Sequence, residues 1–283
     1  MVRAMIYRTK DRGIDMFYHA KEHTVKIGNT QMDYVSFGSG TQPLILIPGL
    51  SFNRVKGSAF SLAYLYRIFA KDYKVYVFDR KDDFSEGYTI KDIAKDTAQA
   101  MKEIGLSHTY VFGVSQGGMI AQYLAVDYPE LVDKLVLGVT LSRQNETVEK
   151  VVHNWIELSK QNDFEGIVVD MLQKMYSDAY VKRYQWLFPI LTKISKPKDM
   201  TRFIILAKAC LTCDIYEELC QIQCPVLVLG GKQDNIITGE ASEEIASKLN
   251  CDIYMYDDLG HSAYEEAKDF NTRIFEFLKR SNS

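Results

Sequence analysis

Short apolar runs recur along the chain, and most of them are rich in β-branched and aromatic residues. Several are apolar without alternation, which is typical of strands that are covered on both faces. These predicted strands lie at 32–37, 44–47, 74–78, 110–114, 134–139, 225–230 and 253–256. The runs before residue 48 are expected to start the fold as an antiparallel hairpin instead.

Segments with helical spacing of apolar residues separate these runs. The predicted helices lie at 90–105, 118–130, 240–249 and 267–280. Strands that alternate with helices predict an α/β fold, with a mostly parallel sheet and helices on both faces. In such sheets, functional sites form at the carboxyl ends of the strands.

The alternation stops in one long segment, residues 142–205, which contains no convincing strand and both tryptophans of the chain. We expect an all-helical lid here, inserted into an α/β core made of residues 1–141 and 206–283. Residues 1–23 are expected to form an N-terminal extension. Most aromatic side chains of the lid are expected to form its own small core, and a few to face a pocket.

Composition narrows the class of protein. The chain has 283 residues, of which 47% are hydrophobic and 25% charged, and its net charge is −3. This balance favours neither nucleic acid nor an anionic membrane surface as a partner. No run approaches the length of a membrane span. The N-terminus lacks the apolar core of a signal peptide, and the cysteine count of five is odd, so a cytoplasmic protein is expected.

Four of the cysteines are spaced closely enough to suggest a zinc site, namely Cys210, Cys213, Cys220 and Cys224. The favoured alternative is one amphipathic helix over 208–224 whose cysteines act as small buried apolar residues. Zinc loops usually carry Gly and polar turn residues between their ligands, and these are absent here. We therefore expect no metal site.

The sequence GVSQGG, residues 113–118, holds the strongest chemical signal. The G-x-S-x-G motif alone is weak, but here an apolar strand precedes it and a helical pattern follows it. In that setting the serine lies on a strained, exposed turn, and the helix N-terminus behind it favours developing negative charge. Ser115 is therefore the candidate nucleophile.

A nucleophilic serine needs a base, and the base needs an orienting acid. His261 follows the last predicted strand and precedes the last helix, so it lies at the carboxyl edge and is the best of five histidines. Asp234, after the strand at 225–230, is the predicted acid. Glu146 is its rival. An oxyanion hole would use the backbone N–H groups of Leu50, after the Pro-Gly turn, and of Gln116.

At this point the chain resembles the α/β-hydrolase fold family, over roughly residues 24 to 280. The resemblance rests on the order of the oxyanion loop 48–51, Ser115, a helical lid, Asp234 and His261. It implies a mostly parallel, eight-stranded sheet, a Ser–Asp–His triad and no cofactor. Family members are mostly esterases, lipases, thioesterases, amidases and carbon–carbon bond hydrolases.

Two loops depart from the pattern of many members. The oxyanion loop has Pro48-Gly49 in place of His-Gly, and the stretch DRKDDFS at 79–85 lacks the usual glycines. Arg80 and Lys81 in this second loop could meet an anionic group of the substrate. A solvated charged turn is the favoured interpretation.

We therefore predict a serine hydrolase that cleaves a small, largely apolar carboxylic ester or thioester through an acyl-enzyme intermediate. The alternatives are a ligand-binding or scaffold protein of the same fold with little turnover, or a perhydrolase or carbon–carbon bond hydrolase. The expected partner is a small-molecule substrate, and the sequence predicts no oligomeric state.

Overall fold

The computed structural model describes residues 18–187, 197 and 199–280. Eight strands form one sheet in the order β1-β2-β4-β3-β5-β6-β7-β8. This confirms the predicted α/β architecture. The strands are β1 (Lys21–Ile27), β2 (Thr30–Phe37), β3 (Gln42–Ile47), β4 (Tyr73–Lys81), β5 (Thr109–Val114), β6 (Val132–Gly138), β7 (Val226–Gly231) and β8 (Asp252–Tyr256).

The first strands pair differently from the prediction. β1 pairs antiparallel with β2, and β2 pairs antiparallel with β4, whereas all pairs from β4 onward are parallel. The hairpin is therefore β1–β2, and the prediction that β3 belongs to it is wrong. β3 lies between β4 and β5, because it pairs with two strands that come later in the chain.

Alternate side chains of the central strands point to opposite faces of the sheet and pack into two separate hydrophobic clusters. In β3, Ile45 and Ile47 belong to one cluster, and Leu44 and Leu46 belong to the other. The first cluster includes residues of α4 (Ile90–Glu103), α5 (Gln116–Asp127) and α11 (Gly239–Leu249). The second includes residues of α3 (Ala59–Leu65) and α13 (Phe270–Lys279). The unbroken apolar run at 44–47 follows from this, because both faces of the strand are buried.

Four core helices correspond to the predicted helical segments, whereas the short helices at Ala59–Leu65 and Ala263–Glu266 were not predicted. α4, for example, begins at a capping box in which Thr89 and Asp92 bond each other's backbone N–H. In the described part of the chain, no helix combines the length and the apolar character that crossing a bilayer requires. The core helices are α3 (Ala59–Leu65), α4 (Ile90–Glu103), α5 (Gln116–Asp127), α11 (Gly239–Leu249), α12 (Ala263–Glu266) and α13 (Phe270–Lys279).

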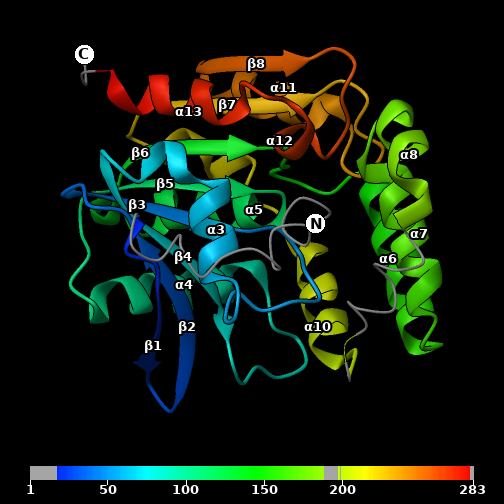
Figure 1. Ribbon diagram of the computed structural model, residues 1–283, viewed down its shortest axis with the longest axis horizontal. Helices are drawn as coiled ribbons and strands as arrows, with labels where there is room; N and C mark the ends of the chain where they lie inside the picture. Colours follow the sequence, from blue (N-terminus) through cyan, green and yellow to red (C-terminus); the bar gives the residue numbers. More distant parts are fainter. Residues whose placement is uncertain (1–17, 188–196, 198, 281–283) are drawn as a thin grey trace.

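The chain between β6 and β7 is helical in its described part, with α6 (Glu146–Lys160), α7 (Phe164–Met175), α8 (Asp178–Tyr184) and α10 (Thr201–Cys210). Figure 1 shows α6, α7 and α8 grouped on the side toward which the β6 and β8 arrows point. Trp155 is buried in α6, whereas Trp186 is 68% exposed. Of the predicted N-terminal extension, residues 1–17 lie outside the described residues and 21–23 belong to β1.

The predicted helix over 208–224 is not one helix. α10 ends at Cys210, and a separate turn of 3₁₀ helix covers Glu217–Gln221. Cys210 and Cys213 are buried, and Cys220 is exposed. Among the described residues, no three side chains of the metal-ligating types gather as a metal site.

The corner between β5 and α5 is packed too closely for side chains at two positions. A Cβ on Gly117 would lie 1.9 Å from the carbonyl oxygen of Ile47, and one on Gly113 would lie 2.2 Å from that of Gly117. These glycines therefore allow α5 to pack directly against the ends of β3 and β5. The backbone of three elements meets at this point, next to Ser115.

Replacing Gly117 by Ala should lower the free energy of unfolding by about 3 kcal/mol or more, because backbone atoms must move to admit the methyl group. Gly166→Ala is the matched control, since Gly166 also lies in the first turn of a helix but the atoms nearest to its Cβ would be those of the Asp163 carboxylate, a side chain that can move, and not backbone atoms. That change should stay within about 1 kcal/mol. Urea denaturation of both variants measures the difference, and equal losses would contradict the packing argument.

Candidate active site

Ser115 lies at the junction of β5 and α5, in a backbone conformation that residues other than glycine rarely adopt. Its φ is 53° and its ψ is −120°. Its carbonyl oxygen accepts hydrogen bonds from the N–H groups of Gly118 and Met119 and from the Thr140 hydroxyl. Such strain persists only where the surrounding structure fixes it, and it is found mostly at functional sites. The turn leaves the Ser115 side chain half-buried, at the wall of a cavity.

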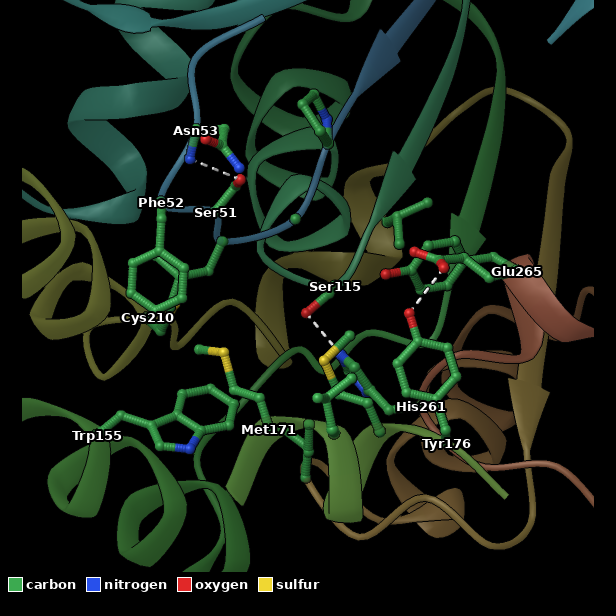
Figure 2. Close-up of a pocket in the computed structure, with 18 of the residues that line it drawn as sticks. Ser51, Phe52, Asn53, Ser115, Trp155, Met171, Tyr176, Cys210, His261 and Glu265 are labelled. Atoms are coloured by element: carbon green, nitrogen blue, oxygen red, sulfur yellow. Dashed lines mark hydrogen bonds between the residues drawn. The ribbon is translucent and has the colours of Figure 1, made fainter. Parts of the chain in front are cut away.

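Three predicted residues form a chain of hydrogen bonds. His261 Nε2 lies 2.9 Å from Ser115 Oγ, and His261 Nδ1 lies 2.7 Å from Asp234 Oδ2 (Figure 2 shows the first of these bonds). Asp234 follows β7, and His261 lies between β8 and α12. Both residues are buried, with 6% and 3% of their surface exposed. The carboxyl ends of three parallel strands thus bring the three side chains together.

The Asp234 carboxylate is held in place by its second oxygen. Oδ1 accepts hydrogen bonds from the backbone N–H groups of Ile236 and Ile237, at 2.8 and 3.0 Å. Its rival Glu146 is the first residue of α6, and its exposed carboxylate pairs with Lys150. Geometry therefore favours Asp234 over Glu146 as the partner of His261.

Three other histidines have partners away from Ser115. His23 bonds Ser36 between β1 and β2, and His108 pairs with Asp133 at the amino end of β5. His153 bonds the carbonyl oxygen of Glu149 within α6. His261 is the histidine that the structure brings to Ser115.

The loop after β3 approaches Ser115 closely. A Cβ on Gly49 would lie 3.3 Å from the Cβ of Ser115, and Leu50 lines the same cavity. Gln116 is the first residue of α5, so its backbone N–H has no carbonyl partner within the helix. The two predicted oxyanion donors thus come from segments that flank the Ser115 side chain.

The burial of Arg80 was not predicted from the sequence. It lies in β4, only 3% of it is exposed, and the expectation of a solvated turn is wrong. Its Nη2 donates to the Pro48 carbonyl at 2.7 Å and to Gln116 Oε1 at 3.0 Å. Gln116 Nε2 donates in turn to the Leu206 carbonyl in α10. One guanidinium group therefore joins the loop after β3 to the first residue of α5.

The Asp79 carboxylate compensates the buried positive charge. Its Oδ1 accepts from Arg202 Nη2 in α10 and from the backbone N–H of Arg80, both at 2.7 Å, and its Oδ2 accepts from the N–H of Val55. Burial lowers the pKa of Arg80 to about 10, although the charge of Asp79 acts to raise it. Arg80 thus stays protonated at neutral pH. The partner Arg202 is 123 residues from Asp79, so no local pattern could have indicated the pair.

The cavity beside Ser115 has a volume of about 270 Å³ and mostly apolar walls. Its side chains come from the loop after β3, from α6 and α7 and from the core. Figure 2 shows Phe52, Trp155 and Met171 on one side of Ser115. A few aromatic residues of the 142–205 segment therefore do face a pocket, while others, such as Phe203, pack in the main core. The apolar lining includes Phe52, Val148, Val152, Trp155, Val168 and Met171.

Replacing Asp79 by Asn should lower the free energy of unfolding by about 3–5 kcal/mol, because it leaves the buried Arg80 and Arg202 without their carboxylate. Asp82→Asn is the control. Asp82 also pairs with an arginine, Arg54, but that pair is more exposed, and its loss should cost about 1 kcal/mol or less. Thermal and urea denaturation measure both variants. Similar losses in the two would contradict a structural role for the Asp79 network.

Comparison with known proteins places this architecture in a family. A family model described as the alpha/beta hydrolase fold matches residues 42–181. A 2-hydroxy-6-oxononadienedioate/2-hydroxy-6-oxononatrienedioate hydrolase from a Pseudomonas species is 26% identical over 223 residues, which are 74% of this chain and 78% of that protein.

Two solved structures share the fold over nearly their whole length. MGS-M2, an alpha/beta hydrolase enzyme from a Medee basin deep-sea metagenome library, has a TM-score of 0.80 and 17% identity, and the match covers 92% of this chain and 98% of that one. The enol-lactonase from Burkholderia xenovorans LB400 has a TM-score of 0.79 and 18% identity, over 91% and 100%. The family match, the relatives and the sheet order together show that this chain is a hydrolase of the α/β-hydrolase fold family.

Proposed function

We propose that this hydrolase cleaves a small, largely apolar carboxylic ester or thioester through an acyl-enzyme intermediate. The observation that carries the proposal is the hydrogen-bond chain from Ser115 through His261 to Asp234, with Ser115 at the wall of a mostly apolar cavity. A serine hydroxyl becomes a useful nucleophile when a base accepts its proton and an acid orients that base. The proposal keeps the cytoplasmic location expected from the sequence.

In the proposed mechanism, Ser115 Oγ attacks the carbonyl carbon of the substrate while His261 Nε2 takes the hydroxyl proton. Asp234 accepts the Nδ1–H of His261, which fixes the tautomer and stabilises the imidazolium that forms. His261 then donates the proton to the leaving alcohol or thiol. A water molecule, activated by the same histidine, hydrolyses the acyl-enzyme.

The tetrahedral intermediates carry a negatively charged oxygen. We propose that the backbone N–H groups of Leu50 and Gln116 hold this oxyanion, supported by the N-terminal end of α5. Arg80 acts as a positioning residue here, because its bonds to Pro48 and Gln116 fix both donor segments. A preorganised pair of donors stabilises charge without reorganising during the reaction.

The helical segment 142–205 is proposed to be a lid on the core formed by residues 1–141 and 206–283. Its helices α6 and α7 contribute Trp155 and Met171 to the cavity. Apolar walls of this kind bind an apolar acyl or alcohol group by removing it from water. The lid therefore supports a preference for small apolar substrates.

One of the relatives supports a second candidate. It is named as a hydrolase of a 2-hydroxy-6-oxo dioate, which is a keto diacid rather than an ester. Hydrolysis of a carbon–carbon bond beside a ketone is therefore the alternative chemistry for the same site. The enol-lactonase among the structural neighbours fits the first candidate, because a lactone is a cyclic ester.

A fluorophosphonate probe should label Ser115, with the modified peptide identified by mass spectrometry. Ser115→Ala and His261→Ala should each lower kcat on an activated ester by about five to six orders of magnitude. Failure of the probe to label well-folded protein would refute the mechanism.

The acid is tested by two conservative variants. Asp234→Asn should lower kcat by about four orders of magnitude, because it disfavours the productive tautomer of His261. Glu146→Gln should leave the rate within about twofold, because surface substitutions of this kind change stability and packing little. The reverse pattern in steady-state kinetics would make Glu146 the acid and Asp234 a structural residue.

A further inference from the structure

The largest side chain that lines the cavity is an indole that packing and a hydrogen bond hold in place. Trp155 lies on α6 and lines the cavity together with Val148 and Val152, which precede it on the same face of that helix. Only 5% of Trp155 is exposed, so it is part of the packed interior and not a loose side chain at the surface. Its Nε1 donates a hydrogen bond to Asp170 Oδ2 of α7 at 2.7 Å. The indole therefore has one fixed orientation.

A second aromatic side chain of the cavity is held by other rings. Phe52, in the loop after β3, stacks on Phe203 of α10 with 4.2 Å between the ring centres. It also makes an edge contact with Phe164 of α7 at 4.9 Å, and both of these neighbours are buried. Moving Phe52 or Trp155 aside would break contacts in a close-packed interior. A cavity with walls of this kind sets a sharp limit on the size of what it binds.

The position of His261 indicates which part of a substrate meets these walls. The histidine returns its proton to the leaving group, so the leaving alcohol or thiol must lie within reach of His261 Nε2. The oxyanion points toward its backbone donors. The acyl chain then extends away from both. Figure 2 shows Trp155 on the side of Ser115 away from His261. The indole therefore lies on the acyl side of the cavity.

We propose that Trp155 is a specificity-determining residue that limits the length of the acyl chain, and that Asp170 is the positioning residue that holds it. This inference rests on the proposed function and adds the substrate class: an ester or thioester with a short, apolar acyl chain. Up to the limit, each methylene group of the chain is removed from water by the apolar walls. Beyond the limit, the chain meets an indole that is fixed in place.

Nitrophenyl esters with linear saturated chains, from acetyl to decanoyl, test the limit. For the wild type, kcat/KM should rise by about fourfold per methylene to a peak and then fall by about tenfold or more per methylene. Trp155→Leu should move the peak to longer chains by about two methylene groups, and Trp155→Phe by about one, because the smaller side chains leave space. Trp155→Phe preserves aromatic packing if Trp155→Leu fails to fold.

Trp186→Leu is the matched control. Trp186 belongs to the same helical segment, but it is 68% exposed and does not line the cavity, so the peak should stay where it is. A wild-type rate that rises all the way to decanoyl would overturn the inference. So would a peak that Trp155→Phe leaves unmoved, or one that Trp186→Leu moves equally.

The role of Asp170 is tested separately. Asp170→Ala removes the acceptor of the indole N–H and should reduce the penalty for the first methylene beyond the peak by about threefold or more. Asp170→Asn keeps an acceptor and should restore the wild-type profile. Lys174→Ala breaks the ion pair of Asp170 but leaves the indole bond, so it should not change the profile. Equal scaling of all chain lengths by Asp170→Ala would show that Asp170 does not position Trp155.

A second series tests the side of the cavity, with acetyl as the fixed acyl group and linear alcohols of increasing length. The Trp155 variants should leave the profile of this series unchanged. If they move the alcohol profile and leave the acyl profile unmoved, Trp155 lies on the leaving-group side and the inference is wrong.

A binding measurement separates this inference from the proposed function. The Kd values of Ser115→Ala for linear primary amides, measured by calorimetry, should decrease with chain length up to the same limit and increase beyond it. Adding Trp155→Phe should move that limit. If no ester shows Ser115-dependent turnover, the proposed function fails, and a limit that moves in this way would still support the role of Trp155. Kd values that do not depend on chain length would contradict it.

Discussion

The unusual backbone of Ser115 is the constraint on which the rest of the site depends. A residue with a side chain adopts φ 53° and ψ −120° only where its surroundings compensate the strain. Here three hydrogen bonds to the Ser115 carbonyl oxygen hold the turn, and the bare backbone at Gly113 and Gly117 lets β3, β5 and α5 meet beside it. The same approach brings the loop after β3 within contact of the serine.

A network of buried charged side chains joins the segments around the Ser115 turn. Arg80 and Asp79, at the end of β4, bond the loop after β3, the first residue of α5 and Arg202 of α10. A buried ion pair often adds little net stability, but losing one partner is costly. The network therefore couples the helical segment to the walls of the site.

Several features of the fold were not predicted from the sequence. β1 was not predicted because it is an edge strand with few buried residues, so its pattern is largely polar. The pairing of β3 between β4 and β5 depends on contacts with later strands, which a local pattern does not specify. The helix predicted over 208–224 is broken after Cys210, although its cysteines kept a helical spacing.

The sequence by itself determined the alternation of strands and helices, and with it the strand ends that carry Ser115, Asp234 and His261. Apolar runs and turn residues are local signals, and parallel strands place their carboxyl ends at one edge. Only the tertiary structure decided that His261 bonds both Ser115 and Asp234, that Arg80 is buried rather than solvated, and that Trp155 lines the cavity. Whether a charged side chain can be buried depends on its partners, and those of Arg80 come from distant segments of the chain.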